Sequence, residues 1–358
     1  MSQQGGVILA AYYIGANDEH GQNPPTAGKR TPVLPYVNRS FYENEYNRPA
    51  KNCFIQACLR CGFDVFDVKP ELTDISVSRR VQRINAQRLT LLVTFGYNAF
   101  GSGSSFNSAA GILTFYAPQG RRPEESRVLA EETYRRLSEN SSQPGRGVAP
   151  LYNVGVLQSV NCPSTLVEPG FMTNFDEAKL MLDPDYHVLT AEDCCQGVCE
   201  CLGADYLPRH RENLPLLRTG SRGNFVELLQ FTLNTVGFSL SVDGIFGSAT
   251  RQAVTRYQTD NGLVADGIVG KNTWKTLMFM PTYPTLRRGN RGSYVRYLQS
   301  KLTTKLYPCG IIDGIFGGDT ERALKQFQQE NALAADGIAG KNTWEVLSKI
   351  GGGRPLTQ

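Results

Sequence analysis

A block of sequence occurs twice in the second half of this chain. Residues 242–274 and 312–344 both contain Asp-Gly-Ile-Phe-Gly, then a helix-like segment, then Ala-Asp-Gly-Ile-x-Gly-Lys-Asn-Thr-Trp. Corresponding residues such as Trp274 and Trp344 lie 70 positions apart. A repeat of this length that occurs twice is typical of two small domains rather than of a solenoid, whose units are shorter and more numerous.

Each unit has the pattern of three short helices separated by Asp-Gly turns. Asp tolerates turn conformations and Gly adopts positive φ without steric cost. We therefore expect two three-helix bundles, at residues 213–280 and 284–350, with Trp274 and Trp344 in equivalent cores. The apolar residues at helical spacing are Val226, Leu229, Leu233, Ala253, Val254 and Tyr257 in the first unit, and Val295, Leu298, Leu302, Ala323, Leu324 and Phe327 in the second.

The repeated segments resemble the type 1 peptidoglycan-binding domain. The resemblance covers residues 213–349 and rests on Leu-Arg-x-Gly-x-Arg-Gly-x-x-Val-x-x-Leu-Gln, Asp-Gly-Ile-Phe-Gly and Asp-Gly-Ile-x-Gly-x-x-Thr-Trp. It implies that the repeats bind the bacterial cell wall. The alternative is a helical repeat that binds another protein. We expect wall contacts beside the four Asp-Gly loops, at Asp243, Asp266, Asp313 and Asp336.

Composition describes an ordinary globular protein rather than a nucleic-acid or membrane protein. Hydrophobic residues make up 41% of the 358 residues, and the net charge of +4 is too small to indicate nucleic-acid binding. The apolar run at Val7–Ala16 is short and no basic residue precedes it, so we interpret it as a strand rather than a signal peptide. We therefore expect cytoplasmic synthesis without membrane insertion, and release to the wall by lysis, a holin or a tail-like device.

Nine cysteines are many for a wall-active protein. Cys58 and Cys61 form a C-x-x-C pair, and the other crowded set is Cys194, Cys195, Cys199 and Cys201. The spacing does not give two regular zinc-ribbon knuckles. Buried reduced thiols are therefore favoured over a metal site.

The first 210 residues alternate between strand-like and helix-like segments. This alternation predicts a mostly parallel sheet that helices cover on both faces. Strands are expected at 7–13, 63–68, 89–95, 111–116, 151–158 and 165–167. Helices are expected at 42–61, 76–87, 124–139, 176–182 and 189–202.

The same region, about residues 7–203, resembles the type 3 family of zinc-dependent N-acetylmuramoyl-L-alanine amidases. The segment Thr165-Leu-Val-Glu-Pro-Gly-Phe-Met-Thr-Asn174 is similar to the closing motif of that family, which implies that Glu168 is the catalytic acid/base. The helix start Glu43-Asn-Glu-Tyr-Asn47 is similar to the segment that supplies a zinc-binding glutamate, here Glu43. Leu92-Val-Thr-Phe-Gly-Tyr-Asn-Ala99 is similar to the strand that carries a second zinc-binding histidine.

The chain departs from the family at both histidine ligands. The family's first zinc-binding histidine follows its first strand, and counting from Val7 places that position on Tyr13. The second histidine lies two residues before the Asn of the Leu92–Ala99 segment, which places it on Gly96. Catalytic zinc needs three protein ligands and an open position. His20 is the candidate replacement, because His20-Gly21 precedes Thr-Ala-Gly-Lys-Arg as in a phage-type variant of the family. Cys162, which lies close before Glu168, is a weaker candidate.

We therefore expect an amidase-like α/β domain at 1–203, a linker at 204–212, the two repeats at 213–280 and 284–350, and a tail at 351–358. The degenerate ligand positions favour a wall-binding pseudo-enzyme with weak or absent zinc. The alternative is an active, endolysin-like amidase, of bacterial or phage origin, that cleaves the lactyl–L-alanine amide of peptidoglycan with Glu168 as general acid/base.

Overall fold

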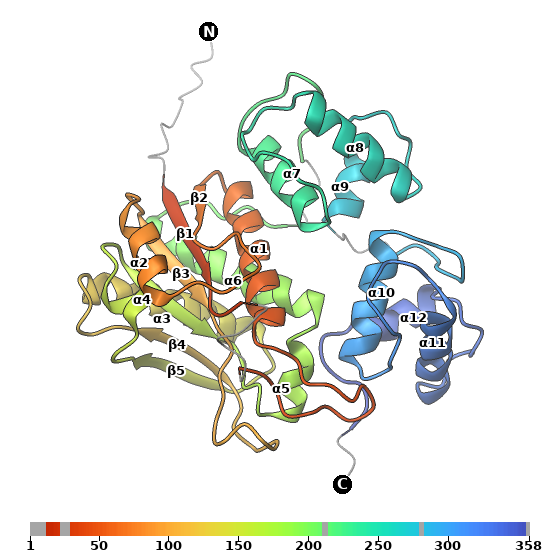
Figure 1. The fold of residues 1–358 in the computed structure, drawn as a ribbon, viewed down its shortest axis with the longest axis horizontal. Coiled ribbons are helices and arrows are strands. Elements are labelled where there is room, and N and C mark those ends of the chain that lie inside the picture. Colours follow the sequence, from red (N-terminus) through yellow and green to blue (C-terminus); the bar gives the residue numbers. More distant parts are fainter. Residues whose placement is uncertain (1–11, 22–28, 210–213, 279–282, 356–358) are drawn as a thin grey trace.

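The computed structural model describes residues 12–21, 29–209, 214–278 and 283–355. A six-stranded sheet in the order β2-β1-β3-β6-β4-β5 forms the first part of the chain (Figure 1). Neighbouring strands are parallel except for the β4–β6 pair. The prediction of a mostly parallel sheet is confirmed. The strands are β1 (Tyr13–Asp18), β2 (Asp64–Asp67), β3 (Leu91–Phe95), β4 (Ile112–Tyr116), β5 (Gly145–Pro150) and β6 (Ser164–Glu168).

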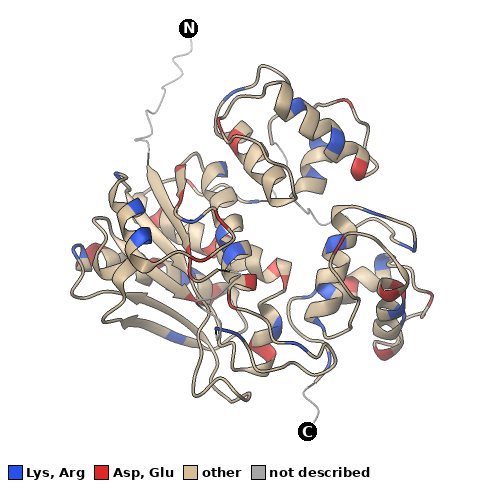
Figure 2. Cartoon of the chain, in the orientation of Figure 1, with Lys and Arg blue, Asp and Glu red and all other residues tan. Residues whose placement is uncertain are grey.

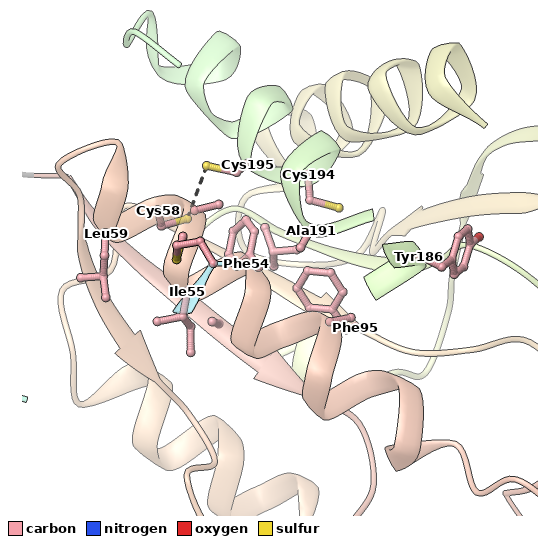
Figure 3. Packing of buried hydrophobic residues seen from close by; sticks show 14 of the residues in the cluster. Phe54, Ile55, Cys58, Leu59, Phe95, Tyr186, Ala191, Cys194 and Cys195 are labelled. Carbon is pink, nitrogen blue, oxygen red and sulfur yellow. Dashed lines mark hydrogen bonds between the residues drawn. The ribbon is translucent and has the colours of Figure 1, made fainter. Parts of the chain in front are cut away.

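Helices cover both faces of this sheet. One face packs against α1 (Asn44–Arg60), α3 (Pro123–Asn140) and α6 (Pro184–Leu202), and the other packs against α2 (Val77–Asn85) and α4 (Gly155–Gln158). The short helix α5 (Phe175–Leu180) follows β6. Along β3, Leu91, Val93 and Phe95 face α1 and α6, whereas Leu92 faces α2 and α4. Figure 3 shows Phe95 against Phe54 of α1. The sheet is therefore buried on both sides, as parallel sheets usually are.

Two segments differ from the predicted pattern. β1 begins where the strand predicted at 7–13 ends, and residues 7–11 lie outside the described part of the chain. Asn17 and Asp18 are fully buried at the end of β1. Asn and Asp are mostly exposed in proteins and are buried only with partners, so these two residues did not predict a buried strand. The strand predicted at 151–158 is wrong. Asn153 has a φ of 64° and α4 follows it, whereas β5 lies before it and is rich in glycine, which is rare in strands.

The last part of the chain consists of two helical repeats. Repeat 1 (214–278) contains α7 (Asn224–Thr235), α8 (Ser248–Asp260) and α9 (Lys271–Leu277). Repeat 2 (283–350) contains α10 (Ser293–Thr304), α11 (Gly318–Glu330) and α12 (Lys341–Leu347). The indole nitrogens of Trp274 and Trp344 donate to the carbonyls of Pro215 and Pro284, at 2.9 Å in both repeats. The two tryptophans therefore occupy equivalent buried positions, as predicted.

Both repeats contact the sheet domain, which is the part of the chain from β1 to α6, but they do so in different ways. The apolar core of repeat 1 is continuous with that of the sheet domain, and α7 packs against α1. Repeat 2 has its own core. It is joined to α6 by the fully buried Lys301, whose Nζ lies 2.8 Å from Asp183 Oδ1 and 3.0 Å from Asp185 Oδ2. The predicted linker packs against the sheet domain at Leu207, whose carbonyl accepts a hydrogen bond from Arg60. The predicted domain limits stay a prediction.

Among the described residues, no helix is both long and apolar enough to cross a membrane. In Figure 2, basic and acidic residues are interspersed over the sheet domain and both repeats.

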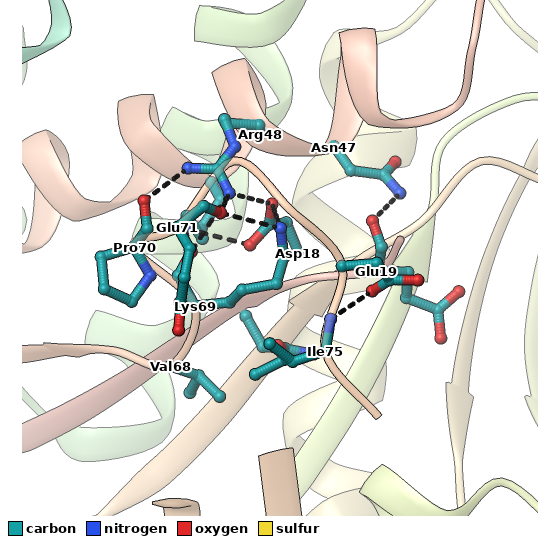
Figure 4. A network of polar contacts seen from close by, with 12 residues as sticks. Asp18, Glu19, Asn47, Arg48, Val68, Lys69, Pro70, Glu71 and Ile75 are labelled. Atoms are coloured by element: carbon teal, nitrogen blue, oxygen red, sulfur yellow. Dashed lines mark hydrogen bonds and ion pairs between the residues drawn. The ribbon is translucent and has the colours of Figure 1, made fainter. Parts of the chain in front are cut away.

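A buried ion cluster holds the end of β1 in place (Figure 4). The carboxylate of Asp18 lies 3.0 Å from Lys51 Nζ, 3.1 Å from Lys69 Nζ and 3.4 Å from an Arg48 nitrogen. Asp18, Lys51 and Lys69 are fully buried. Lys51 also contacts Asp67 of β2, at 2.6 Å. The cluster therefore ties β1 to α1 and to the segment that follows β2.

Asp18→Asn should destabilise the protein strongly. It leaves two buried lysines without the carboxylate that they share, and removal of one partner from a buried ion pair costs about 3–5 kcal/mol. We expect a clear fall in the thermal unfolding midpoint measured by circular dichroism. Glu124→Gln, which removes an exposed partner of Arg127, should change the midpoint little. Equal midpoints for the two variants would contradict a structural role for the cluster.

Candidate active site and metal centre

The candidate site lies where β1, β3 and β6 end. These strands are parallel neighbours, and their register pairs Asp18 with Phe95 and Phe95 with Val167. The next residues of the three strands are therefore Glu19, Gly96 and Glu168, in one row. The Glu19 N–H donates to the Phe95 carbonyl at 2.9 Å, and the Gly96 N–H donates to the Val167 carbonyl at 3.0 Å. Ligands bind at this edge in open α/β sheets.

Glu43 reaches the same place from the residue that precedes α1. Glu43 is 2% exposed. One carboxylate oxygen accepts hydrogen bonds from the Tyr97 backbone N–H, at 3.0 Å, and from Asn47 Nδ2, at 3.1 Å. Asn47 Nδ2 also donates to the Glu19 carbonyl, at 3.0 Å. One oxygen of Glu43 is thus held by the protein, while the other faces His20.

His20 follows Glu19 in a strained backbone conformation, with a φ of 60°. Its Nε2 lies 3.4 Å from the free oxygen of Glu43. Burial, and then the positive charge of Lys29, lower the pKa of His20 to about 4. The imidazole is therefore neutral at physiological pH, so this contact is not an ion pair and one ring nitrogen keeps a lone pair. Strain of this kind is found at functional sites, where the surroundings hold the residue in place.

Glycine at position 21 is required by packing. A side chain there would meet the backbone nitrogen of Asp74 at 2.2 Å. The close approach of this segment to Asp74 holds the turn after His20.

Glu19, His20 and Glu43 form a set of metal-ligating groups. One ligand atom from each residue lies within 4.8 Å of the others. Burial, and then the charge of Glu19, raise the pKa of Glu43 to about 7, and burial raises that of Glu19. Two carboxylates and a neutral imidazole match the oxygen and nitrogen donors that zinc accepts. The residues present therefore fit a divalent cation, which would relieve the repulsion between the carboxylates.

Gly96 provides the space for the Glu19 carboxylate. A Cβ atom on residue 96 would lie 3.1 Å from Glu19 Oε2, 3.1 Å from Leu166 Cδ1 and 3.5 Å from Glu168 Cγ. A side chain at this position would therefore compete with Glu19. Position 96 is one of the two places where the family resemblance implies a histidine ligand. In this chain a carboxylate from the adjacent strand occupies that space.

Glu168 completes the row at the end of β6. Burial, followed by the charges of Glu19 and Glu43, raises the pKa of Glu168 well above its ordinary value. A hydrogen bond from Asn98 opposes this shift. Glu168 thus has a high proton affinity beside the candidate metal ligands, which is the property expected of a general acid/base.

The structure brings together His20, Glu43, Gly96 and Glu168, but not Tyr13. Tyr13 is the first residue of β1, pairs with Asp64 of β2 and lies at the opposite end of the strand from His20. Tyr13 therefore does not line the candidate site, because the first strand is displaced toward the C-terminus from the predicted one, and its assignment as a degenerate ligand position stays a prediction.

The other sequence-level candidates lie elsewhere. Cys162 precedes β6, at the end remote from Glu168, and packs against Val156 and Val160. His187 Nε2 lies 2.7 Å from the Met181 carbonyl. His210 lies outside the described residues. Glu19 was missed, although an acidic residue immediately before the His-Gly pair could have suggested it.

The aspartates of the repeat loops serve the fold. Asp243 Oδ1 accepts hydrogen bonds from Gln230 Nε2, at 2.8 Å, and from the Ile245 N–H, at 2.9 Å. The other three loops repeat this arrangement with Gln258, Gln299 and Gln328 as the donors to Asp266, Asp313 and Asp336. These carboxylates therefore hold their own turns.

A surface groove lies beside the second of these loops, along α8. Its lining includes Arg251, Thr255, Arg256 and Asp266, and Figure 2 shows basic residues on this helix. Arg251 also packs against Gly267 of the loop. The groove lies beside one of the four loops where wall contacts are predicted, and those contacts stay a prediction.

Comparison with known proteins supports both parts of this description. Residues 20–200 match the profile of the N-acetylmuramoyl-L-alanine amidase family. Residues 222–277 and 291–347 match a putative peptidoglycan binding domain.

Curated relatives are similar over parts of the chain. N-acetylmuramoyl-L-alanine amidase CwlM of Mycobacterium tuberculosis is 31% identical over 172 residues, which are 40% of this chain and 41% of the relative. N-acetylmuramoyl-L-alanine amidase CwlL of Bacillus licheniformis is 32% identical over 164 residues, 38% and 46% of the two chains. A spore cortex-lytic enzyme of Bacillus cereus is 41% identical over 64 residues, 18% and 25% of the chains. The chain thus spans less than half the length of these relatives.

Solved structures are similar to the sheet domain. The catalytic domain of CwlV, an N-acetylmuramoyl-L-alanine amidase of Bacillus (Paenibacillus) polymyxa, is 19% identical with a TM-score of 0.46 and covers 54% of this chain and 99% of its own. An N-acetylmuramoyl-L-alanine amidase of Clostridium difficile is 26% identical with a TM-score of 0.43, and the coverage is 54% and 97%. The family profile spans half of the chain. The chain therefore belongs to the N-acetylmuramoyl-L-alanine amidase family and carries two repeats of the putative peptidoglycan binding domain.

Proposed function

We propose that this chain is a zinc-dependent amidase that cleaves the lactyl–L-alanine amide of peptidoglycan. The observation that carries the proposal is the convergence of Glu19, His20 and Glu43 within 4.8 Å, at the strand ends where Glu168 also lies. Three protein ligands with an adjacent acid/base are what a catalytic zinc site requires. Zinc, when bound, polarises a carbonyl and lowers the pKa of a water molecule.

The chain's own residues supply the remaining parts of the chemistry. The hydrogen bonds from Asn47 and Tyr97 orient Glu43, and such contacts to a ligand support metal affinity. His20 is neutral and so can donate a lone pair. Glu168 has the proton affinity to take a proton from the attacking water and to deliver it to the leaving amine of L-alanine.

The second candidate function is that of a wall-binding pseudo-enzyme, and the glycine at position 96 favours it. The resemblance places a zinc-binding histidine at this position, and glycine has no ligand atom. This candidate requires that Glu19 does not replace the missing histidine. The two functions therefore differ in one measurable property, the affinity of the site for zinc.

Zinc should bind to Glu19, His20 and Glu43 in protein purified without chelators. Loss of a residue that hydrogen-bonds to a metal ligand typically weakens metal binding by roughly 10–100-fold. Glu19→Ala and His20→Ala each remove a ligand itself, so each should weaken zinc binding by more than that. Competition with a chromophoric chelator measures the affinity. Glu45→Gln is the matched control, since Glu45 lies two residues from Glu43 but pairs with Arg39. Weak zinc binding in the wild type that is unchanged in Glu19→Ala and His20→Ala would support the pseudo-enzyme.

Glu168→Gln should abolish hydrolysis without removing the metal. We expect the release of stem peptides from purified peptidoglycan to fall by about 100–10,000-fold, the range for loss of a general acid/base. Zinc content should stay at the wild-type level, because Glu168 is not among the proposed ligands. Activity that survives in Glu168→Gln would assign the proton transfer to another residue.

The repeats support targeting to the wall, and the groove on α8 is the proposed contact surface. Arg251→Ala in the full chain should weaken co-sedimentation with peptidoglycan by about tenfold, as expected when a charge-assisted hydrogen bond of ~1.5 kcal/mol is lost. The control is Glu321→Ala, because Glu321 packs on Gly337 in repeat 2 as Arg251 packs on Gly267. Equal losses in both variants would contradict a surface specific to repeat 1.

A further inference from the structure

Four cysteines meet between α1 and α6, away from the proposed active site. Cys58 and Cys61 lie at the C-terminal end of α1, and Cys195 and Cys199 lie one turn apart on α6. Cys195 Sγ is 3.8 Å from Cys61 Sγ and 3.9 Å from Cys58 Sγ. The Sγ atoms of Cys61, Cys195 and Cys199 all lie within 4.8 Å of one another. Figure 3 shows the Cys58–Cys195 contact.

We propose that Cys58, Cys61, Cys195 and Cys199 hold a second, structural zinc ion as thiolates. This site is distinct from the one at Glu43, which lies at the opposite end of α1. The helix has 17 residues, and at about 1.5 Å per residue its two ends are roughly 25 Å apart. The two sites therefore bind metal independently.

Three of the four sulfurs, those of Cys61, Cys195 and Cys199, are grouped closely enough for zinc coordination. Four sulfurs at about 2.3 Å from a zinc ion, at the corners of a tetrahedron, lie about 3.8 Å apart. Cys195 Sγ lies 3.8 Å from Cys61 Sγ and 3.9 Å from Cys58 Sγ, but Cys58 does not belong to the group of sulfurs within 4.8 Å of one another, so its side chain has to shift to become the fourth ligand. A disulfide would require about 2.05 Å, and all nine cysteines are free. The arrangement thus has sulfurs at the spacing of a shared metal ion and not of a covalent bond.

The local backbone presents both pairs of cysteines. Cys58 and Cys61 have the C-x-x-C spacing of zinc ligands. Gly62 follows with a φ of 87°, so the chain turns away directly after the second thiol. On α6 a spacing of four residues places Cys195 and Cys199 on the same face of the helix. Sequence spacing did not indicate the site because its halves come from helices far apart in the chain.

The surroundings resemble those of a closed structural site. Cys58, Cys61, Cys195 and Cys199 are all buried, as expected when four protein ligands leave no open position. The Leu207 backbone N–H lies 3.3 Å from Cys61 Sγ and donates to it. Hydrogen bonds to a coordinating sulfur stabilise the thiolate and orient it. The segment that leads to repeat 1 therefore covers the cluster and supplies one of its contacts.

The competing explanation for the cluster is that its thiols are reduced and only fill space in the core. Cys194 provides the control for this explanation. It is fully buried on α6 next to Cys195, but Figure 3 shows it pointing away from the Cys58–Cys195 contact. A buried thiol that only fills space can be replaced by alanine without any change in metal content. Cys194→Ala and Cys195→Ala remove the same atoms from neighbouring positions, so they form a matched pair.

Metal analysis of the full chain, purified under reducing conditions without chelators, tests the proposal. We expect Cys195→Ala and Cys199→Ala each to lose one zinc per chain relative to the wild type, and Cys194→Ala to lose none. His20→Ala should remove a different zinc, so its effect should add to that of Cys195→Ala. Equal zinc content in Cys195→Ala and the wild type would overturn this proposal and leave the proposed active site untouched.

A second measurement on the unaltered cysteines covers the case in which Cys195→Ala does not fold. In the His20→Ala chain, a mercurial reagent specific for thiols should release one zinc per chain. Cobalt in place of that zinc should give intense sulfur-to-metal charge-transfer absorption. Absence of both signals would show that the four thiols are reduced and metal-free.

Discussion

The buried ion cluster around Asp18 determines where β1 ends, and the candidate active site depends on that position. Taking charges out of water is unfavourable unless each charge meets a partner. Asp18 meets that condition only while β1, α1 and the segment after β2 keep their places, because Lys51 and Lys69 come from the latter two. Glu19 and His20 follow directly. The cluster thus sets the position of two proposed ligands relative to Glu43 at the start of α1.

The carboxylate of Glu19 can take the place of a ligand at position 96 because the two residues follow adjacent parallel strands. Residues in one row at the strand ends point toward the same volume, so a ligand lost from one strand can be replaced from its neighbour. The carboxylate of Glu19 lies where a side chain on residue 96 would lie. A glycine at 96 is therefore what such a replacement needs. In the proposed zinc site the number of protein ligands would stay at three although the histidine is absent.

Repeated motifs and hydrophobic periodicity were sufficient to predict most of the fold. The sheet, the two repeats and the buried tryptophans follow from local patterns. The limits of β1 do not, because Asn17 and Asp18 are buried only through partners distant in sequence, such as Arg80 and Lys51. The distance of Tyr13 from the candidate site follows from that single displacement. Of the candidate site, Glu43, Gly96 and Glu168 were placed by motif, whereas the position of Glu19 beside Gly96 is seen only in the register of the folded strands.

Helix α6 joins the separate parts of this molecule. Its N-terminal end carries Asp183 and Asp185, which hold the buried Lys301 of repeat 2. Its C-terminal half carries Cys195 and Cys199, which face the end of α1. Because α1 begins beside Glu43, a metal bound at the four thiols would connect the core of the sheet domain to the helix that positions a catalytic ligand. Repeat 2 and the proposed zinc thiolate site therefore contact the same helix, α6, at its opposite ends.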